Sequence, residues 1–85
     1  MTIEDIKKAL GITGEYFDDV LQVYFDTTKI YLHNAGVADE KMNIGVVARG
    51  VADLWNYGAG QGTWSKIFID MASQLALGGE VDENI

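Results

Sequence analysis

The sequence predicts an all-α fold, a compact four-helix domain with one long helix, and three observations support this prediction. Proline is absent from the 85 residues, and most of the ten glycines lie between the helical segments. Within each segment, apolar residues recur at the i, i+3, i+4 and i+7 positions that form one face of a helix. No two runs of alternating apolar and polar residues predict a pair of strands.

The first helix is predicted over residues 2–10. Thr2 can cap it, because the carboxylate of Asp5 three residues later completes a capping-box pattern. Gly11 follows the last apolar position and is typical of the left-handed residue that ends a helix. The apolar face of this helix consists of Ile3, Ile6 and Leu10.

The second and longest helix is predicted over residues 15–34, with Gly36 beyond its end. Its core-facing stripe consists of Phe17, Val20, Leu21, Tyr24, Thr28, Tyr31 and Leu32. Three more apolar residues, Val23, Phe25 and Ile30, lie off that stripe. Because this apolar surface is wider than one side of a small bundle needs, it predicts a second contact face on the helix.

The third helix is predicted over residues 42–57. Asp39 and Glu40 stand before it, where acidic side chains interact favourably with the positive end of the helix dipole. Gly45 and Gly50 lie inside it, and each costs roughly 1 kcal/mol relative to alanine. They indicate either a close backbone approach to another element or a tolerated weakness. The core-facing stripe consists of Ile44, Val47, Ala48, Val51, Leu54 and Trp55.

A glycine-rich loop over residues 58–62 precedes the last helix. A phosphate-binding loop would need a preceding strand and a final glycine–lysine–serine or –threonine, so this loop is predicted to be a hinge. The last helix has an apolar face and ends before Gly78 and Gly79. Residues 1–79 form the helical domain, and residues 80–85 form a short acidic C-terminal tail. The apolar face of the last helix consists of Trp64, Ile67, Phe68, Met71, Ala72 and Leu75.

The composition excludes several classes of protein. Thirteen acidic and six basic residues give a net charge of −7, the wrong sign for binding nucleic acid or an anionic membrane by the general surface. No apolar run approaches the roughly 20 residues that a membrane span requires. The N-terminus lacks the basic start and apolar stretch of a signal peptide, so we expect the protein to be made and kept in the cytoplasm or in an assembly formed there.

No arrangement of side chains predicts catalysis. Cysteine is absent and histidine occurs once, which leaves no set of zinc ligands. Asp18 and Asp19 are neighbours on a helix and therefore point in different directions. Ser65 and Ser73 have no histidine at a useful spacing, and His33 is expected at a helix end or on the surface. We expect no enzyme activity, no cofactor and no metal.

Several residues are candidates for contacts with other chains. Arg49 lies one turn before Asp53, which is consistent with a local ion pair or with a bridge between subunits. The aromatic residues Trp55, Tyr57 and Trp64 flank the glycine loop and suit a protein interface or the core equally well. The complete candidate interface consists of Val23, Phe25, Ile30, Arg49, Gly50, Trp55, Tyr57 and Trp64.

Three stretches also carry a family resemblance. The chain opens with TIEDIKKALGI at residues 2–12, and its long helix carries DDVL at 18–21 and closes with YLHNAGV at 31–37. The third helix reads GVVARGVADLWNYG at residues 45–58 and is followed by the glycine loop and a final helix. From residue 2 to about residue 77, this pattern resembles the phage head–tail connector family of head-completion and DNA-packaging adaptor proteins.

The resemblance implies a structural role in the virion. Family membership would make the chain one subunit of a homo-oligomeric ring at the head–tail junction, formed from protein made in the bacterial cytoplasm. The ring would dock on the portal protein, extend the DNA channel and recruit the next head-completion or tail protein. DNA would pass through it without sequence-specific binding, and no membrane would be involved.

Three other classes of small helical protein are alternatives to this interpretation. An acyl carrier domain is also acidic and four-helical, but it needs an aspartate–serine–leucine tripeptide that this chain lacks. A DNA-binding helix-turn-helix is disfavoured by the near absence of basic residues from the third and fourth helices. A small acidic helical regulator that binds another protein as a monomer or dimer is the remaining alternative.

Overall fold

The computed structural model describes residues 1–57 and 64–77, and the side chain of Tyr57 lies outside that description. The described part is all-α, which confirms the predicted fold class, and it contains no strand. The elements are α1 (Ile3–Leu10), α2 (Asp18–Asn34), the 3-10 turn η1 (Asp39–Lys41), α3 (Ile44–Tyr57) and α4 (Lys66–Ala76). The predicted glycine loop, the glycines after the last helix and the acidic tail lie outside the described residues.

The predicted ends of α1 are confirmed in detail. The Thr2 hydroxyl accepts the N–H of Glu4 at 3.2 Å, and the Thr2 N–H donates to the Asp5 carboxylate at 3.0 Å. These two bonds complete the capping box. At the other end Gly11 has φ of 74°, the left-handed conformation that favours glycine.

Helix α2 begins later than predicted. The chain forms a turn first, in which the N–H of Asp18 donates to the carbonyl of Glu15 at 3.1 Å, and the helix begins at Asp18. Its other end follows the prediction, since Gly36 has φ of 98° and the N–H of Val37 bonds back to the Leu32 carbonyl at 2.9 Å. Val37 thereby turns inward and is buried.

Helix α3 also begins two residues later than predicted. The side-chain oxygen of Asn43 accepts the N–H of Val46 at 3.0 Å and satisfies one of the free donors at the start of the helix. Asp39 and Glu40 lie before α3, as the sequence predicts, but they belong to the separate turn η1, and the first turn of α3 contains no acidic side chain.

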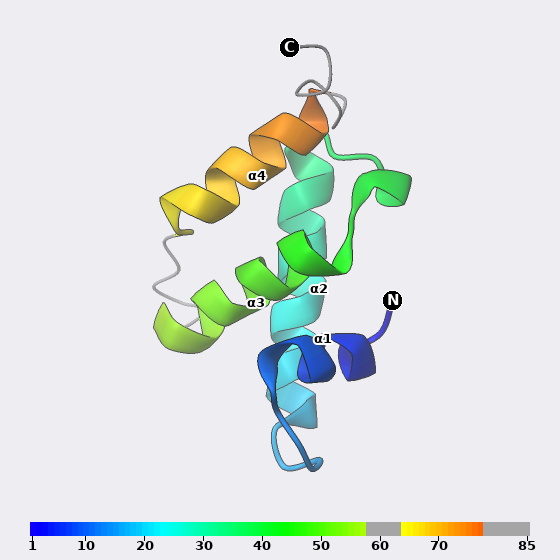
Figure 1. Ribbon diagram of the computed structural model, residues 1–85, viewed down its shortest axis with the longest axis vertical. Helices are drawn as coiled ribbons and strands as arrows, with labels where there is room; N and C mark the ends of the chain where they lie inside the picture. Colours follow the sequence, from blue (N-terminus) through cyan, green and yellow to red (C-terminus); the bar gives the residue numbers. More distant parts are fainter. Residues whose placement is uncertain (58–63, 78–85) are drawn as a thin grey trace.

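Helix α3 occupies the centre of the packing. It packs on α2 and α1 and, to a smaller extent, on α4. In Figure 1 the long helix α2 is crossed by α1 near its N-terminal end, by α3 near its middle and by α4 near its C-terminal end. The molecule is elongated, with extents of 44 × 25 × 18 Å. The buried apolar core consists of Ile6, Leu21, Phe25, Leu32, Val37, Val46, Val47, Ala48, Val51, Leu54, Phe68 and Ala72.

The core-facing stripes differ from the predicted ones on three helices. On α2 the fully buried positions are Leu21, Phe25, Thr28 and Leu32, so the prediction that Phe25 lies off the core stripe is wrong. The actual stripe is rotated away from the half-buried tyrosines toward Phe25, because α3 crosses on that side. The predicted core residues Phe17, Ile44, Trp55 and Ile67 are among the exposed large hydrophobic side chains.

Candidate interaction surface

The outer side of α2 carries an uncharged, largely apolar strip. Val23 is 55% exposed and Ile30 is 61% exposed, and Val20 and Thr27 beside them are half-buried. We call these four residues the outer strip of α2. Their spacing of three, four and three residues places them on one helix face, away from the buried face that holds Leu21. The second contact face predicted on this helix therefore has two exposed members, Val23 and Ile30.

Polar side chains line the neighbouring face of α2. Asp19, Asp26 and His33 are exposed there, and the Gln22 side-chain amide donates to the Asp26 carboxylate at 3.0 Å. The formal charges of the outer surface of α2 therefore lie beside the strip and not in it. A face with this division can bury its apolar residues against another chain while the charged side chains stay in water.

Four aromatic side chains form a cluster at the N-terminal end of α2. The ring of Phe17 meets that of Trp55 on α3 edge to face, with centroids 5.0 Å apart, and Tyr16 meets Phe17 at 4.8 Å. Tyr24 also meets Trp55 edge to face, at 6.3 Å. Tyr16 is 90% exposed, and Phe17 and Trp55 are more than one third exposed. This aromatic cluster is preformed, because each ring is held by another, and it still presents a large exposed area.

Trp64 lies in a different environment. Its ring stacks on Phe68 with centroids 4.6 Å apart and also contacts Tyr31 of α2 at 4.8 Å. Phe68 is fully buried and Trp64 is half-buried. Trp64 therefore extends the core between α2 and α4, whereas Trp55 belongs to the exposed aromatic cluster.

Arg49 and Asp53 form the local pair that was one of the two sequence interpretations. The Arg49 Nε lies 3.5 Å from the Asp53 carboxylate, which is almost completely buried. The same carboxylate accepts the backbone N–H of Ser65 at 2.9 Å, while the Ser65 hydroxyl accepts the N–H of Phe68 at 3.2 Å and caps α4. Asp53 thus joins α3 to the start of α4, and this explains why an acidic side chain is buried there.

Gly50 is buried where three helices meet. A Cβ atom at this position would lie 2.5 Å from the Thr28 methyl group and 2.7 Å from the Phe68 ring. Of the two sequence interpretations of the helical glycines, close approach therefore applies to Gly50. The residue is inaccessible in the folded subunit, so it shapes the packing of α2, α3 and α4.

Lys7 and Asp18 join the first two helices. The Lys7 ammonium donates to the Asp18 carboxylate at 2.8 Å and lies 3.8 Å from the carboxylate of Glu4. The hydrogen bond to Asp18 raises the pKa of Lys7, nearby carboxylates including Glu15 also raise it, and burial opposes them. Asp18 therefore has a structural partner, Lys7 of α1.

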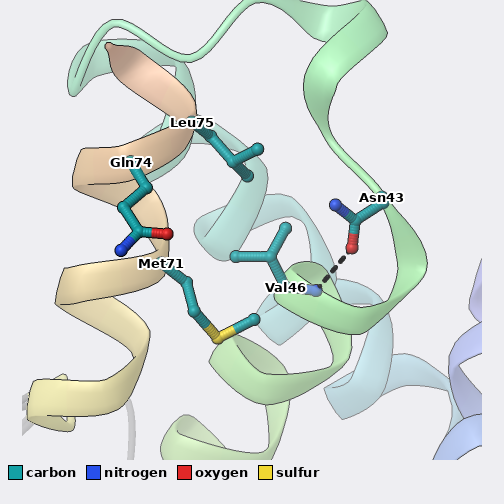
Figure 2. A pocket seen from close by; sticks show the side chains of 5 residues that line it. All are labelled: Asn43, Val46, Met71, Gln74 and Leu75. Carbon is teal, nitrogen blue, oxygen red and sulfur yellow. Dashed lines mark hydrogen bonds between the residues drawn. The ribbon is translucent and has the colours of Figure 1, made fainter. Parts of the chain in front are cut away.

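Two hollows are present among the described residues. One, of about 160 Å³, lies between α3 and α4. Figure 2 shows Met71 and Leu75 of α4 facing Val46 of α3 across it, beside the Asn43–Val46 hydrogen bond. The other, of about 260 Å³, is lined by Met1, Lys29, Asp39 and Met42. Neither contains an arrangement of a nucleophile, a base and an orienting partner.

The described part of the chain contains neither a group of metal-binding side chains nor a membrane-spanning helix. Within residues 1–57 and 64–77, no three His, Cys, Asp or Glu side chains are grouped so that they could hold a metal ion. No helix in those two ranges is both long enough and apolar enough to cross a membrane.

The predicted interface residues therefore divide into three groups. Val23, Ile30 and Trp55 are exposed on the outer strip and the aromatic cluster, and Arg49 is partly exposed. Phe25 and Gly50 are buried, and Trp64 is half-buried. The side chain of Tyr57 lies outside the description. The sequence interpretation missed Tyr16, an exposed member of the aromatic cluster. The available signal was its position shortly after Gly14, which has a positive φ of 81° and turns the chain before α2.

Comparison with protein-family models, curated proteins and solved structures gives no match to this chain.

Proposed function

We propose that this protein is a structural subunit of a phage head–tail connector ring, which docks on the portal, extends the DNA channel and recruits the next head-completion or tail protein. The observation that carries the proposal is the exposed apolar surface formed by the outer strip of α2 and the aromatic cluster. The family resemblance of residues 2–77 and the all-α fold are consistent with it.

A ring needs two different contact surfaces on each subunit, because each copy meets one neighbour on each side. The outer strip of α2 supplies one candidate surface. Exposed Ile69 and Leu77, eight residues apart on and just beyond α4, supply candidates for a second surface. Large exposed side chains of this kind, rimmed by polar residues, are typical of protein–protein interfaces.

The net charge of −7 supports a role around DNA without binding to it. Carboxylates lining a channel repel the phosphates, so the genome can slide instead of adhering to the wall. This part of the proposal predicts an acidic lumen in the assembled ring. A lumen lined mainly by basic side chains in an assembled structure would contradict it.

The test measures mass and stoichiometry by light scattering coupled to size exclusion, for the subunit alone and after mixing with the portal protein of the same phage. We expect a discrete multimer, or a complex in which many copies join one portal ring. Val23→Asp and Ile30→Asp should abolish this association, because each places an unpaired charge in an apolar contact.

Two controls make this result interpretable. Asp26→Asn changes the polar face next to the strip and should leave the assembly intact. Circular dichroism of each variant should show unchanged helix content, because Val23 and Ile30 are exposed. Normal assembly by both folded aspartate variants would refute the role of the outer strip.

A small acidic regulator is the second candidate function, because the same exposed apolar surface could bind one target protein. It predicts a monomer or dimer and one-to-one stoichiometry with that target. A subunit that stays monomeric and ignores the portal in the same experiment would favour the regulator over the connector.

A further inference from the structure

We infer that α4 undocks from α1–α3 as a single unit while the rest of the domain stays folded. The proposal concerns the isolated subunit and does not depend on the connector function. It rests on how α4 is attached, on a packing defect beneath it, and on the apolar residues that α4 leaves exposed.

Helix α4 supplies two of the eleven described residues of the buried core cluster. Among the described residues, its fully buried side chains are Phe68 and Ala72, whereas α1, α2, α3 and Val37 supply the other members of the core cluster. It packs mainly on α3, with a further ring contact from Phe68 to Tyr31 of α2, while α1, α2 and α3 all contact one another. The first three helices can therefore keep most of the core intact when α4 leaves.

A buried polar defect lies beneath α4. The Thr28 hydroxyl is completely buried and has no hydrogen-bond partner. The Thr28 methyl group and the Phe68 ring flank the same point beside Gly50, so removal of Phe68 uncovers the Thr28 side chain. Hydration of the hydroxyl recovers a hydrogen bond that the docked state lacks, and this favours undocking.

The outer side of α4 keeps apolar surface in water even when the helix is docked. Ile67 is 58% exposed and Leu77 just beyond the helix is 76% exposed. A hollow of about 160 Å³ that opens to the surface separates part of α4 from the start of α3, with Asn43 and Gln74 beside the apolar Met71, Leu75 and Val46. Along this hollow the two helices do not touch directly, so α4 buries less surface there than a continuous helix interface would. Undocking exposes the surface of α3 and Tyr31 that α4 covers in the docked state.

Hydrogen–deuterium exchange of the intact protein tests the inference directly. We expect amides of α4 to exchange roughly a hundredfold faster than the slowest amides of α3, with a weaker dependence on low concentrations of denaturant. Equal protection and equal denaturant dependence in α3 and α4 would overturn the proposal, because both helices would then open only in global unfolding.

Two pairs of variants sharpen the test. Phe68→Ala should remove protection from α4 while α3 stays protected, and exposed Ile67→Ala is its matched control. Thr28→Val should slow exchange in α4 roughly fivefold by removing the unpaired hydroxyl, whereas half-buried Thr27→Val should not. Parallel loss of protection in all helices of Phe68→Ala, or unchanged α4 exchange in Thr28→Val, would contradict the inference. If Phe68→Ala does not fold, the wild-type exchange pattern and the comparison of Thr28→Val with Thr27→Val still test whether α4 undocks alone.

Discussion

Gly50 sets how closely α3 approaches its neighbours. In an open helix, replacing glycine by alanine stabilises the fold by about 1 kcal/mol. Here the added methyl group would overlap the side chains of Thr28 and Phe68, and overpacking of a core costs about 1–3 kcal/mol. We therefore expect Gly50→Ala to lower the free energy of unfolding by a net amount of up to about 2 kcal/mol, as measured by urea denaturation. A stabilised variant would show that the junction is looser than these distances indicate.

Lys7 makes stability depend on pH in a defined direction. Its pKa in the folded protein is raised, chiefly by the hydrogen bond to Asp18. A raised pKa means that the stabilisation is fully present below the unfolded value of about 10.4 and is lost as the pH rises through the folded pKa. Wild type should exceed Lys7→Met in unfolding free energy by a constant amount near neutral pH, and this difference should shrink above about pH 10.

The comparison between these two proteins removes the contribution of other titrating groups. Every other ionisable group is present in both proteins, so its contribution cancels in the difference. A difference that grows with rising pH would have the opposite sign to the one predicted. The charge on Lys7 would then not be what holds α1 to Asp18.

Among the elements, α4 depends on its cap. The Ser65 hydroxyl accepts the N–H of Phe68 at the start of the helix, and loss of such a cap costs about 1 kcal/mol. We expect Ser65→Ala to lower the free energy of unfolding by about this amount in urea denaturation. Ser73→Ala, at an exposed position inside the same helix, should be neutral or slightly stabilising because alanine is the better helix former.

The sequence predicted the helices well because their signals are local. Thr2 caps the start of α1 and Gly11 ends it, each through contacts with residues a few positions away. The sequence around each end is therefore sufficient to identify it. The rotation of α2 could not be predicted in this way. Whether Phe25 or Tyr24 faces the core depends on where α3 crosses, and that crossing depends on the absence of a side chain at Gly50.

The candidate surface was partly predicted for the same physical reason. Val23 and Ile30 are separated by seven residues, which places them on one face whatever the tertiary structure, and both are exposed. The aromatic cluster joins Phe17 and Trp55, which are distant in sequence, and only the packing of α2 against α3 brings them together. The role of Arg49 was left open by the sequence. Asp53 lies one turn away, and this spacing is compatible with a local pair and with a bridge to another subunit.

At the scale of the whole molecule, charge and apolar surface act against each other. Each copy carries a net charge of −7, so two copies repel, while the outer strip of α2 and the aromatic cluster favour contact. Salt screens the repulsion, since the Debye length falls from about 10 Å at 0.1 M to about 3 Å at 1 M. Burial of apolar surface does not weaken on screening.

We therefore expect homotypic association to strengthen as sodium chloride rises from about 0.05 to about 0.5 M, as measured by sedimentation velocity. Val23→Asp and Ile30→Asp should remove this response, because they disrupt the apolar contact that drives association once salt has screened the repulsion. The proteins should be compared at equal concentration, with Asp26→Asn as the control for a change in charge outside the strip. Association that weakens with salt would mean that opposite charges hold the copies together, and the outer strip would then face something other than a second copy of this chain.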